Sequence, residues 1–147
     1  MSHFEATLLS PENRPRLVRD CVDLVDAEVD GKGGLSGLAL KTAFKAIKVV
    51  KPELVERGVS SLLDAWVVEL GKHYQHWEAG GGQPGSFGAY CREASSAVAE
   101  SLLSVTDARV RKADPRIAGM YEKLRPNARE HVLAAVPQLG DILDRYL

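Results

Sequence analysis

The sequence lacks several features that would assign it quickly to a functional class. Its 147 residues contain no apolar run near the length of a membrane span, so no transmembrane helix is expected. The net charge is −1, without the basic excess that is usual in nucleic-acid-binding proteins. The first residues, MSHFEATLLS, include an acid and lack the basic and apolar regions of a secretory signal. We therefore expect a cytoplasmic protein that does not bind nucleic acid.

Cysteine is also scarce. Cys21 and Cys91 are the two cysteines, and they lie far apart in the chain. In a cytoplasmic protein such residues are expected to be reduced and buried. Neither has a neighbouring base in the sequence that would activate a thiol, so nucleophilic catalysis is not indicated. The sequence favours a protein that is not an enzyme, and it predicts no cofactor.

The alternation of apolar and polar residues that is typical of strands is absent, and the helical period dominates. We predict an all-α fold, a single domain over residues 1–147 built as a bundle of about six mainly antiparallel helices. A short turn around Phe4 and Leu8 is expected before the first of them, and a flexible glycine-rich loop is expected at about 79–86. The predicted helices cover about 15–29, 36–50, 52–78, 87–112, 114–124 and 126–146. Asp114 followed by Pro115 is a helix start signal, with Asp114 as the cap and the proline at the first helical position.

The stretch DAEVDGKGGLSG, residues 26–37, begins like a calcium-binding loop because an acid occupies every second position. The bidentate glutamate that such a loop needs at its twelfth position is replaced by Gly37. Apolar residues at helical spacing also run through the acids to Val29. The pattern therefore indicates the acidic end of a helix, which the following glycines terminate.

The predicted helix 36–50 is apolar around most of its circumference, which is typical of a central helix in a bundle. We predict that it forms the centre together with the helix 52–78. Its one polar stripe consists of Lys41, Lys45 and Lys48, which share a face because they follow one another by four and three residues. These lysines are candidate binding residues for an anion or for the negative end of a ligand. A solvated or internally paired face is the alternative.

The best candidate for a metal site is Glu69, His73 and His76 in ELGKHYQH. Spacings of four and three residues place the three side chains on adjacent helical surface. They could hold zinc or iron if another helix supplied a further ligand. His73 also lies in phase with the apolar positions Trp66 and Leu70, where a buried histidine with a hydrogen-bond partner is the alternative.

Three blocks of the sequence resemble a family of small, all-helical bacterial proteins of unknown function. They are LLSPENRPRLVRDCVDLVDAEV, SGLALKTAFKAIKVVKP and LLSVTDARV, and they follow one another along the chain. The resemblance implies a bacterial, cytoplasmic and helical protein. It implies no activity, cofactor or catalytic residue, because the family has none assigned.

The sequence alone therefore leaves the function unknown. The leading hypothesis is a cytoplasmic interaction protein that forms a homodimer. The first alternative is a protein that binds an apolar or amphipathic small molecule within the bundle, with Lys41, Lys45 and Lys48 facing its anionic end. The second alternative is a metal-binding bundle that uses Glu69, His73 and His76.

Overall fold

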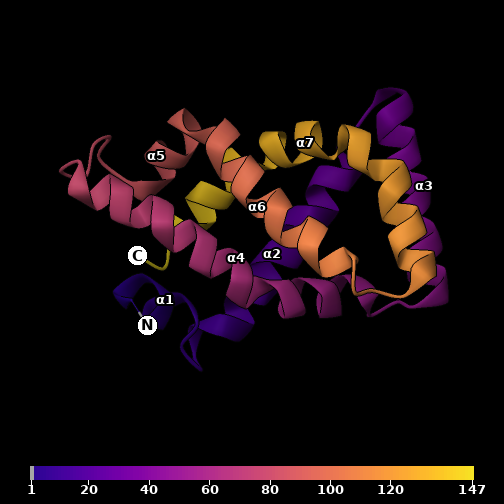
Figure 1. Cartoon of the computed structure of the whole chain (residues 1–147), viewed down its shortest axis with the longest axis horizontal. Helices are drawn as coiled ribbons and strands as arrows, with labels where there is room; N and C mark the ends of the chain where they lie inside the picture. Colours follow the sequence, from indigo (N-terminus) through magenta and orange to yellow (C-terminus); the bar gives the residue numbers. More distant parts are fainter. Residues whose placement is uncertain (1) are drawn as a thin grey trace.

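The computed structural model describes residues 2–147, apart from the side chain of Ser36, and all regular structure within them is helical. Figure 1 shows the helices wrapped around one another in an elongated bundle. The all-α prediction is confirmed, although the described residues form seven helices rather than about six. The helices are α1 (His3–Leu8), α2 (Asn13–Asp30), α3 (Gly34–Val50), α4 (Leu54–Ala79), α5 (Phe87–Glu93), α6 (Ser95–Val110) and α7 (Pro115–Asp144).

The helix boundaries differ from the prediction at two places. The predicted helix 87–112 is two helices, α5 and α6, because the backbone of Ala94 leaves the helical region at φ −99° and ψ 25°. The predicted helices 114–124 and 126–146 are one helix, α7, which contains Pro126 and Pro137. A proline removes one backbone hydrogen bond. At Pro137 the helix continues because apolar residues on both sides of it, from Val132 to Leu143, pack against the core.

The predicted start signal of α7 is confirmed in detail. The Asp114 carboxylate accepts a hydrogen bond from the backbone N–H of Arg116 at 2.9 Å, and Pro115 occupies the first helical position. This cap satisfies one of the free N–H groups that every helix start leaves. The acidic stretch before Gly31 likewise forms the end of α2 and not a calcium loop, since α2 continues to Asp30.

The buried apolar residues form one connected core between α1, α2, α4, α5, α6 and α7. Its aromatic part lies where α1 and α5 pack against α4. The ring of Phe4 lies 4.7 Å from that of Tyr74 and 5.6 Å from that of Phe87, between centroids. Phe4 and Leu8 are almost completely buried, so the short predicted turn at the start of the chain is an ordered helix.

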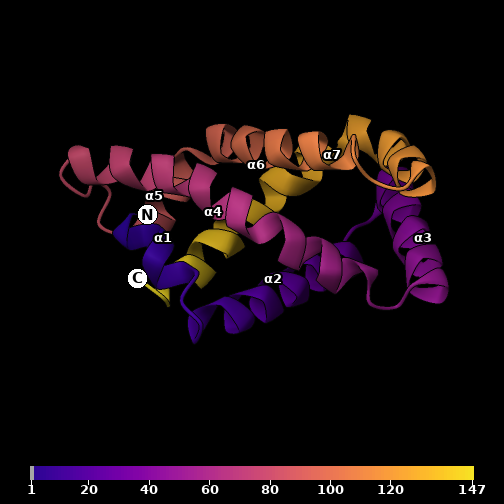
Figure 2. The same ribbon diagram turned by 60° about the horizontal axis from the view of Figure 1, so that its bottom comes forward.

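The prediction that helix 36–50 is central in the bundle is wrong. This helix is α3, and it lies at one end of the molecule, across the long axis and away from both chain termini (Figures 1 and 2). Leu40 is its only buried large side chain among the residues whose side chains the structure describes. Its opposite face is exposed. A helix that is apolar around most of its circumference is therefore not central in this protein.

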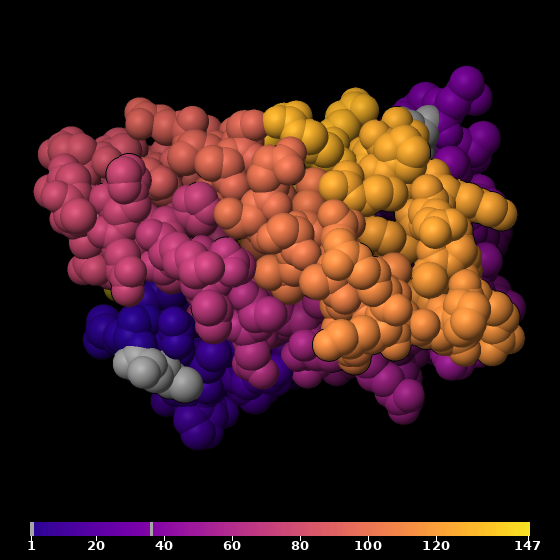
Figure 3. Space-filling model, viewed as in Figure 1, coloured from indigo at the N-terminus to yellow at the C-terminus, as the bar shows by residue number. Residues whose placement is uncertain are grey.

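No helix in the described part of the chain is both long and apolar enough to span a bilayer. The space-filling view shows α4, α6 and α7 covering one broad face of the molecule, with α3 visible only along its edge (Figure 3).

Candidate ligand cavity

A half-open cavity of about 360 Å³ lies between the helices of the bundle. Five helices contribute to its walls: α2, α3, α4, α6 and α7. The cavity has an almost purely hydrocarbon surface, because aliphatic side chains line most of it. The leucine and aromatic side chains in its walls are Leu17, Leu24, Leu40, Leu63, Leu70, Leu102, Leu103, Leu124, Leu139, Leu143, Phe44, Trp66 and Tyr121.

The cavity has a small polar region formed by Glu28, Lys32 and His131. Lys32 Nζ lies 3.2 Å from Glu28 Oε2, and both side chains are largely shielded from solvent. The Nδ1 atom of His131 is buried and has no hydrogen-bond partner among the described residues. Burial and the charge of Lys32 lower the pKa of His131, so the ring is neutral at pH 7. A neutral imidazole nitrogen without a partner can bond a polar group of a ligand.

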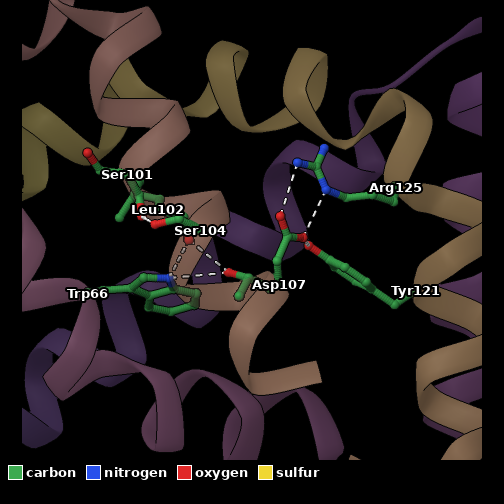
Figure 4. Close-up of polar contacts among 8 residues, drawn as sticks. Trp66, Ser101, Leu102, Ser104, Asp107, Tyr121 and Arg125 are labelled. Carbon is green, nitrogen blue, oxygen red and sulfur yellow. Dashed lines mark hydrogen bonds and ion pairs between the residues drawn. The ribbon is translucent and has the colours of Figure 1, made fainter. Parts of the chain in front are cut away.

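A polar network holds α6 and α7 together beside the cavity (Figure 4). Asp107 on α6 accepts hydrogen bonds from Arg125 Nε at 2.9 Å and from the Tyr121 hydroxyl group, both on α7. Burial raises the pKa of Asp107, but the hydrogen bonds from Arg125 and Tyr121 outweigh it, so the pKa lies below its ordinary value. Because Tyr121 also lines the cavity, the network fixes part of its wall.

Trp66 on α4 is held in place through its indole nitrogen. Trp66 Nε1 donates to the carbonyl oxygen of Leu102 at 3.2 Å and to the Thr106 hydroxyl at 3.3 Å (Figure 4). This contact connects α4 to α6 and orients an aromatic ring that lines the cavity. The walls are therefore held by directional bonds as well as by packing.

We expect Asp107→Asn to lower the free energy of unfolding at pH 7 by about 1 to 2 kcal/mol, because two charge-assisted bonds are weakened. The folded pKa of Asp107 lies below the unfolded value. Its stabilisation is therefore complete above the unfolded value of about 4 and is lost as the pH falls through the folded one. The difference between parent and variant should shrink accordingly in urea titrations from pH 7 to pH 2.

Asp141→Asn is the matched control for this prediction. Asp141 pairs with Arg92 at 2.8 Å, but the two side chains are 61% and 53% exposed. Exposed pairs contribute little, so this variant should remain within about 0.5 kcal/mol of the parent. An equal loss in both variants at every pH would contradict the role given to Asp107.

Two of the three predicted metal ligands, Glu69 and His73, have other polar partners. Glu69 Oε1 lies 2.9 Å from Lys72 Nζ, and His73 Nε2 lies 2.9 Å from the Ser101 hydroxyl oxygen. Burial lowers the pKa of His73, and the hydroxyl of Tyr90 lies 3.5 Å from its Nδ1 atom. Among the described residues, no group of three or more His, Cys, Asp or Glu side chains is arranged to hold a metal ion. Metal binding by Glu69, His73 and His76 stays a prediction.

The predicted anion-binding lysines all lie exposed on α3. Lys48 Nζ lies 3.1 Å from Asp26 Oδ1, whereas no ion pair is found for Lys41 or Lys45 within the described part of the chain. The lysine in the cavity wall is Lys32, which precedes the helix. Anion binding by Lys41, Lys45 and Lys48 stays a prediction, but none of them lines the cavity.

Both cysteines are free and buried, as the sequence indicated. Burial, with a smaller contribution from the charge of Asp20, raises the pKa of Cys21 to about 12. Burial also raises the pKa of Cys91 to about 12. Neither thiol is a reactive nucleophile at neutral pH. Cys21 contributes to the cavity wall as an apolar side chain.

No motif in the sequence marks the residues that form the cavity and its polar region. His131 is 99 residues from Lys32 in the numbering and shares no motif with it. A second hollow, on the surface, was missed for the same reason. It is lined by Arg16 and Arg19 of α2 and by Arg145 and Tyr146 near the end of the chain. Asp20 accepts a hydrogen bond from the Tyr146 hydroxyl there and lies 3.6 Å from Arg145 Nη2.

The fold is a helical bundle with an apolar, half-open cavity between its helices. The family model described as "Family of unknown function (DUF6918)" matches residues 4–147, nearly the whole chain. The protein therefore belongs to this family, in agreement with the resemblance noted from its sequence blocks. No curated protein matches the chain. No solved structure matches it either.

Proposed function

We propose that this protein binds a single-chain amphipathic molecule, with an apolar chain in the central cavity and a polar head at His131 and Lys32. The observation that carries the proposal is the volume of about 360 Å³ within almost purely hydrocarbon walls. A cavity of about 150 Å³ already holds benzene in a protein core, and pockets for small molecules begin near 300 Å³. The space suits an acyl chain of medium length.

The polar region supports an amphipathic ligand over a pure hydrocarbon. The His131 Nδ1 atom has no partner in the described part of the chain. A buried polar atom without a hydrogen bond costs about 1 to 3 kcal/mol. A ligand hydroxyl or carboxyl group beside His131 would supply the missing bond, and the ammonium group of Lys32 lies close enough to affect the pKa of the ring. A medium-chain fatty acid combines an acyl chain for the apolar walls with a carboxyl group for the bond to His131.

The test is a calorimetric titration of the protein with dodecanoate, below the concentration at which the fatty acid forms micelles. We expect saturable binding of one molecule per chain. We also expect a rise in thermal stability, because a ligand at one hundred times its dissociation constant adds about 2.7 kcal/mol. Ala135 lines the cavity. Ala135→Trp should fill the space and weaken binding at least about tenfold, or about 1.4 kcal/mol.

The neighbouring residue provides the control. Ala134 is exposed on the same helix, so Ala134→Trp should bind dodecanoate as the parent does. His131→Leu should weaken dodecanoate binding while leaving the folded state intact, because it removes the polar contact alone. If neither dodecanoate nor dodecanol bound saturably, or if Ala135→Trp bound as tightly as the parent, the cavity would be a packing defect and not a ligand site.

A further inference from the structure

The outer face of α3 is the most apolar exposed surface that the structure describes. Six large apolar side chains of the described residues are markedly exposed, and four of them belong to this helix. Leu35 is 87% exposed and Val49 is 78% exposed. The spacing of the exposed apolar positions places them on one face, together with Ala39, Thr42 and Ala46, which are also exposed. The four are Leu35, Leu38, Val49 and Val50.

Lysines run along one side of this apolar face. Lys41 follows Leu38 by three residues and Lys45 precedes Val49 by four, so each lies beside the apolar stripe on the helix surface. Lys41, Lys45, Lys48 and Lys51 are all exposed. Residues 31–51 hold five lysines and no acidic residue. The inner face of α3, with Leu40 and Phe44, packs toward the cavity.

The same end of the molecule carries the second basic segment of the chain. The first half of α7 lies beside α3 in both ribbon views, and the two helices are in contact (Figures 1 and 2). Residues 107–130 hold seven basic and four acidic residues. The net charge is +5 over residues 31–51 and +3 over residues 107–130, so the rest of the chain is strongly acidic.

We infer that the outer face of α3 binds the surface of an anionic lipid bilayer, with its apolar side chains in the interface and its lysines on the headgroups. An exposed apolar stripe beside lysines is the pattern of a helix that lies in the plane of a membrane surface. Helix α3 carries lysines and no acidic residue, so its charge is complementary to that of anionic headgroups. The binding is peripheral, and it requires neither a spanning helix nor the cavity ligand.

Charge decides between a bilayer and a second copy of the chain. Two α3 helices packed through their apolar stripes would bring two sets of lysines together, and α3 offers no carboxylate to pair with them. Like charges across such an interface oppose association. Anionic headgroups, in contrast, attract lysines, and each lysine near the bilayer surface strengthens binding roughly fivefold. The peripheral position of α3 also leaves this face accessible to a bilayer (Figure 2).

The experiment is a vesicle sedimentation assay with the full chain, without added fatty acid. One set of vesicles contains phosphatidylcholine alone, and the other contains an equal mixture of phosphatidylcholine and phosphatidylglycerol. We expect sedimentation with the mixed vesicles, little with the neutral ones, and release in high salt because salt screens the headgroups. The double variant Lys41→Gln/Lys45→Gln should bind about 25-fold more weakly. Val49→Glu should bind at least about tenfold more weakly.

The controls are on α4, away from this face. Lys72→Gln and Val68→Glu alter an exposed lysine and an exposed valine there, and both should sediment as the parent does. Equal binding to both kinds of vesicle, binding to neither, or equal losses in the α3 and α4 variants would overturn the inference. A dimer in lipid-free light scattering that Val49→Glu converts to a monomer would also overturn it, because the face would then belong to self-association.

Discussion

Gly140→Val is expected to destabilise the protein by about 3 kcal/mol, because α5 and α7 cross at a pair of glycines. A Cβ atom at Gly140 would lie 3.0 Å from the Cα atom and 3.1 Å from the carbonyl oxygen of Gly88, and 3.2 Å from the Cβ atom of Cys91. Two of these neighbours are backbone atoms, which cannot rotate away, so the helices must separate. Overpacking of this kind costs about 1 to 3 kcal/mol even where side chains can adjust.

The same crossing also carries a hydrogen bond that helix separation would break. The backbone N–H of Gly88, near the start of α5, donates to Asp144 Oδ1 on α7 at 2.8 Å. The loss should appear in urea or thermal unfolding, where about 3 kcal/mol corresponds to a fall in melting temperature of roughly 10 °C. Gly140→Ala should show a smaller loss in the same direction.

Gly119→Ala is the matched control on the same helix. A Cβ atom at Gly119 would meet no other atom within 4 Å. A glycine inside a helix costs about 0.5 to 1 kcal/mol relative to alanine, so Gly119→Ala should stabilise the protein by that amount. The opposite signs at positions 119 and 140 distinguish a steric effect from a general effect of removing glycine. A stabilising Gly140→Ala variant would show that the two helices are not in close contact.

Much of the fold followed from the sequence because helical periodicity and chain breakers are local signals. The segments that became α2 and α4 were predicted with nearly the observed bounds, since glycines and Pro52 separate them from their neighbours. The cap at Asp114 was predicted because its side chain and the following proline act within one turn. The errors at Ala94 and Pro126 arose where tertiary packing decides whether a helix bends, ends or continues.

The position of α3 could not be predicted from its composition. A helix that is apolar on most sides satisfies two different arrangements: burial in the centre, or one face on the core and the other on a partner outside the protein. The sequence shows which residues are apolar, but it does not show whether they contact the core or a partner outside the protein. The same ambiguity applies to Lys41 and Lys45, which the sequence placed on one stripe without indicating that the stripe would border an exposed apolar face.

The cavity was beyond sequence analysis for a geometric reason. Its walls come from helices that are distant in sequence, and its volume depends on how closely those helices approach. The possibility of a small-molecule binder was predicted, but with the lysines of α3 as its polar side. The residues in the wall are instead Lys32 and His131. The sequence around His131 is marked mainly by Pro126 and Pro137, which indicate helix ends or kinks and not a binding site.

Phe4→Ala is expected to cost about 3 to 5 kcal/mol, as removal of a fully buried aromatic ring usually does. Phe4 is 1% exposed, and its ring contacts Tyr74 of α4 and Phe87 of α5. Helix α1 has only six residues, which is too short for stability on its own. Its attachment therefore depends on Phe4 and on Leu8, the other buried residue of the helix.

Because two buried residues hold α1 in place, the helix can detach locally. If α1 detaches before the rest unfolds, amide hydrogen exchange in α1 should accelerate more than exchange in α4 and α7. Urea unfolding followed by tryptophan fluorescence should also show the loss, because the ring of Tyr74 that packs on Phe4 lies 5.3 Å from the ring of Trp77. Val68→Ala, at a site that is 43% exposed on α4, should change stability by less than about 0.5 kcal/mol. A Phe4→Ala variant as stable as this control, with unchanged exchange in α1, would show that the first helix does not hold the aromatic core together.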